Sequence, residues 1–277
     1  MALFNKQPEK QQAQPQETTN IEWFDDKRHR ILFYGKAKEG KTFSLCAIID
    51  EAHRLGKKVF YVSTDDGFTP TFKSYFGERA AEVAKCITYY RCLTSSDGAK
   101  ASRDIVKKAQ AGDWVFVDLI SNFYEIAQDE YIDVIAPNGD PVEYIKNAAK
   151  DPAFIGGFTQ DKWQIIKRIN SVIITPLTRL CKAHVVGVCG IKDTEVEKAI
   201  HTKGGKKADT RMDKSFDKVL YRPSGLKLMS YDFETIVLIS RDDDKRYFKV
   251  VGHRGKEFTN EEYFYEKDMW KELKKCL

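Results

Sequence analysis

The chain has 277 residues, of which 42% are hydrophobic and 31% are charged, and its formal net charge is +5. This length suits one large α/β domain or two small ones, and the charge permits a nucleic-acid partner without requiring one. No apolar run reaches the roughly 18 residues of a membrane span and no signal peptide is evident, so we expect a cytoplasmic protein without membrane association.

The first 20 residues differ in composition from the rest of the chain. Residues 1–20 are rich in Gln, Pro and Glu, contain little after Phe4 that could be buried, and are predicted to be a disordered tail. Residues 21–277 are predicted to form one folded core. Its six cysteines form no C-x-x-C pair and are expected to be buried, reduced thiols.

Residues 35–42 read G-x-x-x-x-G-K-T, which is the P-loop pattern. Apolar residues 31–34 predict a strand before it, and residues 43–55 carry apolar side chains at helical spacing after it. A chance match in a chain of this length is on the order of one in a hundred. We therefore predict a site for ATP at this turn.

The P-loop pattern assigns a role to each of its residues. Glycines let the backbone wrap closely around an anion, and the N–H groups at the start of the helix point at phosphate oxygens. Lys41 is predicted to reach the β- and γ-phosphates, as an exposed charge of the loop, and Thr42 to bind Mg²⁺. The residues predicted to bind the nucleotide are Gly35, Lys36, Ala37, Lys38, Glu39, Gly40, Lys41, Thr42 and Phe43.

Strands and helices alternate after the P-loop. Strands are predicted at residues 57–63, 87–92 and 113–118, and helices at 71–85 and 97–111. This alternation predicts an α/β fold with a mostly parallel, twisted sheet and helices on both faces.

The second half of the chain is less regular. Residues 125–160 are acidic, contain Pro and Gly breakers, and are predicted to be an insertion over the sheet. The elements predicted to follow are a helix at 161–182, a strand at 184–190, a polar segment at 193–218, a strand pair at 233–241 and 247–251, and a polar helix at 260–277.

Acidic residues end two of the predicted strands. Asp118 follows four apolar residues and is predicted to hold Mg²⁺ beside the P-loop. Asp65 and Asp66 follow the strand after the first helix, and one of them could polarise the attacking water. Asp-Asp-Gly is also a good turn sequence, so a purely structural role stays open.

Two stretches resemble known ATPase families. Thr64, Asp65, Phe68 and Pro70, with the strand at 115–121, are similar to RecA/RadA-type recombinases. Residues 233–242 and 250–255 resemble the final strand pair of DnaB-type helicases. The resemblance covers roughly residues 30–256 and implies a RecA-like P-loop core. Phage single-strand-annealing ATPases are similar in size, which would place the protein in a host cytoplasm.

The resemblance implies further roles. It implies a Mg²⁺-dependent ATPase in which Asp65 takes the position of a catalytic Glu and Arg254 acts on the γ-phosphate of a neighbouring subunit. A homo-oligomer, as a ring or filament, follows from that. The basic loop after the 184–190 strand is implied to bind single-stranded DNA through Lys203, Lys206, Lys207 and Arg211.

The chain also departs from these families. Leu119 and Gly252 replace a usual Ser and a usual Lys, and no polar sensor ends the 184–190 strand, although Lys192 could take that role. Recombination, annealing and replication therefore remain open, as does an assembly or packaging ATPase without direct action on DNA strands. A small-molecule kinase is disfavoured because no Arg-rich lid follows Asp118, and a GTPase because no N-K-x-D element is present.

Overall fold

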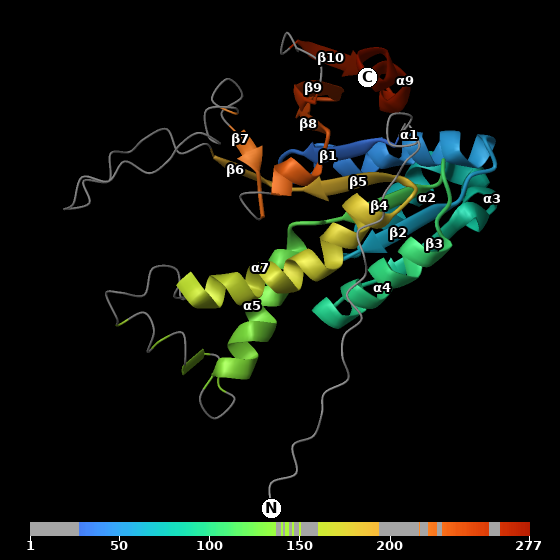
Figure 1. The fold of residues 1–277 in the computed structure, drawn as a ribbon. Helices are drawn as coiled ribbons and strands as arrows, with labels where there is room; N and C mark the ends of the chain where they lie inside the picture. Colours follow the sequence, from blue (N-terminus) through green and yellow to red (C-terminus); the bar gives the residue numbers. More distant parts are fainter. Residues whose placement is uncertain are drawn as a thin grey trace, which may run out of the picture.

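A computed structural model describes residues 28–136, 160–193, 216, 221–225, 229–254 and 261–277, with a few single residues between 140 and 150. Figure 1 shows a central sheet with helices packed on both sides. The predicted tail at residues 1–20 and half of the predicted 125–160 insertion lie outside the described residues, and both remain predictions.

The sheet has eight strands in the order β10-β9-β8-β1-β5-β4-β2-β3. The six strands from β8 to β3 are parallel, whereas β9 and β10 are antiparallel to their neighbours. The strands are β1 (Arg30–Tyr34), β2 (Val59–Ser63), β3 (Ile87–Arg91), β4 (Trp114–Asp118), β5 (His184–Cys189), β8 (Thr235–Asp242), β9 (Lys245–His253) and β10 (Glu262–Tyr265). Strand β5 lies between β1 and β4, and all three are parallel. Their carboxyl ends therefore lie side by side at the same end of the sheet.

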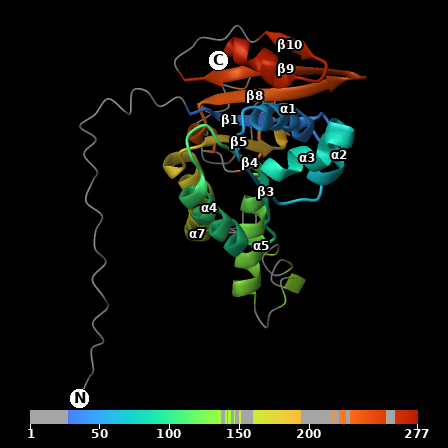
Figure 2. The same ribbon diagram turned by 90° about the vertical axis from the view of Figure 1, so that its right-hand side faces the viewer.

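Alternation along each central strand divides the core into two layers. In β1, Ile31 and Phe33 face one cluster of buried residues, while Leu32 and Tyr34 face the other. The first layer is covered by α1 (Lys41–Arg54), α2 (Phe68–Phe76), α3 (Ala80–Val83) and α9 (Met269–Cys276). The second is covered by α4 (Ser95–Lys108), α5 (Asn122–Ile135) and α7 (Gln160–Thr175), as Figure 2 shows from the side. The predicted α/β fold is confirmed.

The single helix predicted at 71–85 is wrong. The chain forms α2, a 3-10 turn at Gly77–Arg79, α3 and a second 3-10 turn at Ala84–Cys86. Gly77 has φ = 56°, which ends α2 because a residue in the left-handed region cannot continue a right-handed helix. The helix predicted at 161–182 also ends earlier, and a π-helical turn at Pro176–Leu180 follows α7.

The C-terminal prediction of one polar helix is also wrong. Residues Glu262–Tyr265 form β10, and the helix begins only at Met269. Asp268 accepts a hydrogen bond from the Lys271 amide and caps that helix. Trp270 is fully buried and donates to Glu51 of α1 at 2.9 Å, so α9 is anchored to the sheet-covering layer.

The remaining boundaries agree closely with the sequence. The antiparallel hairpin β8–β9 turns at Asp243, which has φ = 49°. Helix α5 occupies the first part of the predicted 125–160 insertion and buries Phe123 and Ala127 against the core. None of the six cysteines, all of which lie among the described residues, forms a disulfide; Cys46, Cys92, Cys181 and Cys189 are buried, and Cys86 and Cys276 are partly buried.

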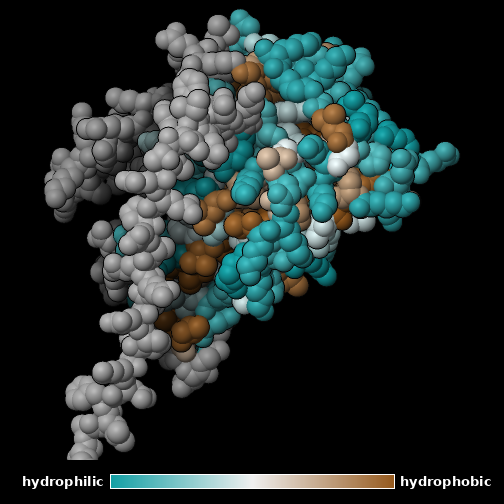
Figure 3. All heavy atoms as spheres, turned by 45° about the vertical axis from the view of Figure 1, so that its right-hand side comes forward, coloured by the Kyte–Doolittle hydropathy of each residue, from teal (hydrophilic) through white to brown (hydrophobic). Residues whose placement is uncertain are grey.

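Figure 3 shows one side of the surface as largely hydrophilic, with small hydrophobic patches between hydrophilic residues. Among the described residues, no helix combines the length and apolar character needed to cross a bilayer.

Candidate functional site

The P-loop joins the carboxyl end of β1 to the first turn of α1. Gly40 has φ = +97°, a conformation that favours glycine, and it precedes the first helical residue, Lys41. A Cβ on Gly35 would lie 2.3 Å from the Ile239 carbonyl oxygen of β8. Both glycines of the motif are therefore required by the backbone itself.

Lys41 is buried rather than exposed, which corrects the sequence-based expectation. Only 9% of its surface is accessible, and its ammonium donates to the carbonyl oxygens of Gly35 at 2.9 Å and Lys36 at 2.6 Å. Its side chain folds back across the loop and satisfies carbonyl groups that would otherwise lack donors. Burial lowers the pKa of this ammonium, and the negative charge of Asp118 opposes that effect.

The loop already holds one anionic oxygen of its own chain. The amide of Lys36 donates to the Glu39 carboxylate at 2.6 Å. A carboxylate oxygen on a P-loop amide occupies the kind of position that a phosphate oxygen takes in such loops. The contact shows that this backbone is oriented to bind an anion.

Asp118 ends β4 and is 1% exposed. Its Oδ2 accepts hydrogen bonds from the Thr42 hydroxyl at 2.9 Å and from the Tyr61 hydroxyl at 2.6 Å. Burial raises the pKa of the Asp118 carboxyl, and these two hydrogen bonds oppose the rise. The residues that the sequence placed at a metal site, Thr42 and Asp118, are thus in direct contact.

The second oxygen of this carboxylate bears on whether the site fits a cation. Among the described residues, Asp118 Oδ1 is buried and has no hydrogen-bond partner. Buried polar atoms without a protein partner are rare, and each calls for an explanation such as an ion, a water or a catalytic role. A hydroxyl and a carboxylate oxygen beside a phosphate-binding loop are ligands that suit Mg²⁺.

The two acids after β2 point to different places. Asp65 accepts a hydrogen bond from the Gly67 amide at 3.0 Å. Its negative charge is close enough to raise the pKa of both Lys41 and Asp118. Asp66 instead forms a 3.1 Å ion pair with Arg91 at the end of β3, and its side chain is 78% exposed. Of the two, Asp65 is the carboxylate on the P-loop side.

Sequence reasoning missed two residues at this edge of the sheet. Tyr61 lies in the middle of β2, and only its hydrogen bond to Asp118 reveals it. Arg246 follows the β8–β9 turn, and its guanidinium lies 4.0 Å from the centre of the Phe43 ring and against Gly40. No local motif marks either residue, because each reaches the P-loop through strand order.

Arg254 lies at the end of the sheet opposite the P-loop, beside the amino end of β8. It follows β9, whose last residue, His253, pairs with Thr235 at the start of β8. Its amide donates to Glu234 and its guanidinium donates to the Tyr231 carbonyl. Since β8 is parallel to β1, this position is remote from the P-loop of the same chain.

The predicted DNA-binding residues Lys203, Lys206, Lys207 and Arg211 lie outside the described residues.

Lys192 is exposed on the short strand β6 (Ile191–Asp193), which pairs with β7 (Tyr221–Pro223). The Tyr221 ring lies 4.9 Å from the Lys36 ammonium, so this two-stranded ribbon touches the P-loop.

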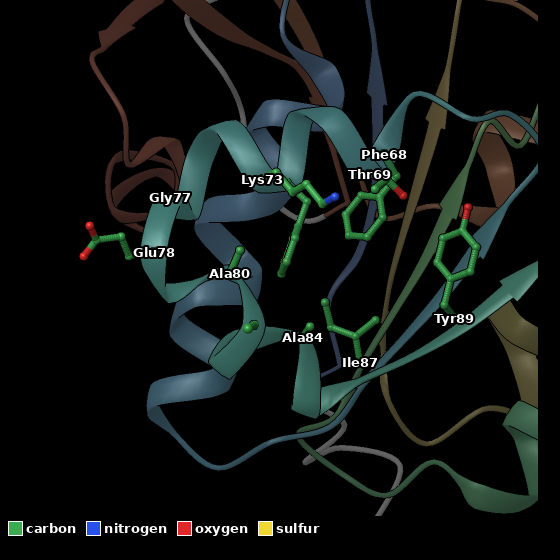
Figure 4. Close-up of a pocket in the computed structure, with 11 residues that line it drawn as sticks. Phe68, Thr69, Lys73, Gly77, Glu78, Ala80, Ala84, Ile87 and Tyr89 are labelled. Carbon is green, nitrogen blue, oxygen red and sulfur yellow. The ribbon is translucent and has the colours of Figure 1, made fainter.

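A separate apolar cavity of about 590 Å³ lies between α2, α3 and β3. Figure 4 shows Phe68, Ile87 and Tyr89 around this space. The Phe68 ring stacks on Tyr61 at 3.7 Å, which separates the cavity from the carboxylate of Asp118. None of the predicted nucleotide-binding residues lines it.

Comparisons with known proteins add little to this geometry. No protein-family model matches the chain, and no curated protein matches it. The crystal structure of the RadB recombinase matches with 13% sequence identity and a TM-score of 0.47, over 86% of this chain and 88% of that one.

Proposed function

We propose that the protein binds and hydrolyses ATP with Mg²⁺ and acts on single-stranded DNA. The observation that carries the nucleotide part is the contact between Thr42 and Asp118, 2.9 Å apart, beside a P-loop at the carboxyl edge of a parallel sheet. This edge is where open α/β sheets bind their ligands.

In this proposal each group of the site has its own task. The P-loop amides bind the phosphates, and Lys41 leaves the carbonyls of Gly35 and Lys36 to bind the β- and γ-phosphate oxygens. Thr42 and Asp118 would hold Mg²⁺, which neutralises charge on those oxygens. Tyr61 fixes the Asp118 carboxylate through its 2.6 Å hydrogen bond. Asp65 orients the attacking water.

The positions of the carboxylates bear on the direction in which a nucleotide would lie. Asp118 ends β4 and Asp65 follows the last residue of β2 by two positions, so these carboxylates would face the γ-phosphate. On the side of β8 and β9, the guanidinium of Arg246 lies over the Phe43 ring. A guanidinium and an aromatic ring are both able to stack on a base.

The carboxylates should separate by role. We expect Asp118→Asn to weaken Mg²⁺-dependent ATP binding and hydrolysis together, since it removes a charge at the metal. Asp65→Asn should bind ATP normally but turn over about 10²–10⁴-fold more slowly, the usual scale for a lost general base. Steady-state ATPase rates and nucleotide titrations measure both effects.

Asp66→Asn is the matched control, because it removes the same charge from the adjacent residue. It should retain turnover, since Asp66 pairs with Arg91 at the surface. A larger loss in Asp66→Asn than in Asp65→Asn would show that Asp66 is the catalytic acid.

DNA binding is proposed for the basic loop on the basis of its charge. Replacing Lys203, Lys206, Lys207 and Arg211 with alanine should weaken binding of single strands. The slope of log K against log salt should flatten by about 0.7 for each phosphate group that the variant no longer neutralises. A variant with the wild-type affinity and slope would leave the loop without this role.

An assembly or packaging ATPase without direct action on DNA strands is the second candidate. It is favoured by Asp65, a short carboxylate held by the Gly67 amide, in the position of a catalytic acid. ATP turnover with and without single-stranded DNA distinguishes the two. Stimulation by DNA supports the first proposal, whereas slow turnover that DNA leaves unchanged supports the second.

A further inference from the structure

A cavity of about 350 Å³ lies where α5, α7 and the β6–β7 ribbon meet. The residues around it that matter here are two aromatic, three basic and one acidic: Tyr124, Trp163, Lys167, Lys192, Arg222 and Glu125. Its size is at the small end of the range for ligand sites, which suits a group as small as one nucleotide.

One wall of the cavity is aromatic. The rings of Tyr124 on α5 and Trp163 on α7 are stacked, with centroids 5.9 Å apart and planes inclined by 21°. Both side chains are only partly buried, so part of the aromatic surface stays accessible. Aromatic surfaces of this kind bind bases of any sequence, because each base offers a π-face.

Basic side chains also line the cavity. Lys192 and Arg222 are directly opposed in the β6–β7 register, so both side chains extend from the same face of the ribbon. Lys167 lies one helical turn after Trp163 and therefore on the same face of α7. Three cations and one carboxylate leave this cavity with a net positive charge, which attracts phosphates.

We propose that this cavity binds one nucleotide unit of a single-stranded nucleic acid, with the base on Tyr124 and Trp163 and the phosphates on Lys167, Lys192 and Arg222. The assignment rests on the proposed function and extends it to residues outside the predicted basic loop. That loop contains no aromatic residue at 203–211, so it could not supply base stacking itself.

The β6–β7 ribbon contacts both the cavity and the P-loop. Along β7, Tyr221 and Arg222 point to opposite faces because side chains alternate in a strand. Arg222 lines the cavity, while Tyr221 lies against Lys36 of the P-loop. A nucleic-acid strand held on one face of the ribbon therefore acts on a residue beside the phosphates through the other face.

The aromatic part is tested by fluorescence anisotropy with a labelled thymidine oligodeoxynucleotide and, in parallel, a uridine oligoribonucleotide. Trp163→Ala should bind about 5- to 150-fold more weakly, the effect of losing one stacked base. Trp163→Phe keeps a ring and should restore most of the affinity. If Trp163→Ala fails to fold, Tyr124→Ala removes the other ring of the stack and should weaken binding on the same scale. The arm with the larger loss identifies DNA or RNA as the ligand.

The basic part is tested by salt dependence. Lys167→Ala with Lys192→Ala should reduce the slope of log K against log salt by about 1.4, because each neutralised phosphate of a single strand contributes about 0.7. Lys85→Ala with Lys107→Ala removes two exposed charges elsewhere and should leave the slope unchanged. Heparin competition should be weaker than oligonucleotide competition, because heparin offers charge without bases.

Measuring ATP affinity on every variant distinguishes failure of the proposed function from failure of the cavity assignment alone. If the wild-type protein binds no oligonucleotide while it still binds ATP, the DNA part of the proposed function fails. If the wild-type protein binds and both Trp163 variants and the double lysine variant bind equally well, the cavity is not the site, although the proposed function stands.

Discussion

Lys41→Ala is expected to abolish ATP binding. The ammonium has two carbonyl partners in the free protein, at 2.9 and 2.6 Å, and exchanges them for phosphate oxygens when ATP enters. A hydrogen bond to a charged group is worth about 1.5–3 kcal/mol, so losing two of them weakens binding by at least about 100-fold. Isothermal titration with a slowly hydrolysed ATP analogue measures the change directly.

The stability of this variant needs its own control. Lys41 is buried, so its removal also leaves the carbonyls of Gly35 and Lys36 without their donor. Thermal unfolding of Lys41→Ala beside Lys58→Ala, an exposed lysine before β2, shows whether the fold persists. Wild-type affinity for ATP in a folded Lys41→Ala protein would refute the P-loop assignment.

Arg254→Ala is expected to bind ATP normally and to hydrolyse it about 10³–10⁵-fold more slowly, the usual worth of an arginine finger. In its own chain Arg254 lies at the end of the strands opposite the P-loop, so any action on an ATP site would have to be on the site of a neighbour. The specific activity of the wild-type protein should therefore rise with protein concentration.

Mixed subunits test this arrangement. Arg254→Ala and Lys41→Ala proteins should each be inactive alone, yet partly active when mixed, since some interfaces then pair an intact P-loop with an intact Arg254. Arg246→Ala offers a contrast, because Arg246 contacts Phe43 of its own chain beside the P-loop, so a mixture of Arg246→Ala with Lys41→Ala should show no rescue. The trans-acting role is wrong if mixtures show no gain and activity is independent of concentration.

The P-loop and Asp118 could be located from the sequence because both are local patterns. Two glycines before a Lys-Thr pair define a turn, and an acid after a buried strand must emerge at the strand's end. The alternation of strands and helices likewise predicted the parallel sheet, since each buried strand is a short apolar run bounded by polar residues.

Features that depend on strand order could not be read from the sequence. Tyr61 reaches Asp118, and Arg246 reaches Phe43, only because β2 lies beside β4 and β8 beside β1. The burial of Lys41 was missed for a different reason, since a lysine in a Gly-rich turn gives no sign that the carbonyls of its own loop will accept its hydrogen bonds. The break at Gly77 was missed because glycine is also tolerated within helices.

The placement of Arg254 and the P-loop at opposite edges of the sheet constrains how copies could associate. In a two-fold symmetric pair, both ends of the strands would have to lie in one self-complementary surface. If Arg254 instead contacts a neighbour's P-loop in a head-to-tail arrangement, the assembly has a direction. In a closed ring every ATP site would receive an arginine, whereas an open chain would leave one terminal site incomplete, so hydrolysis there would lag behind that of the interior.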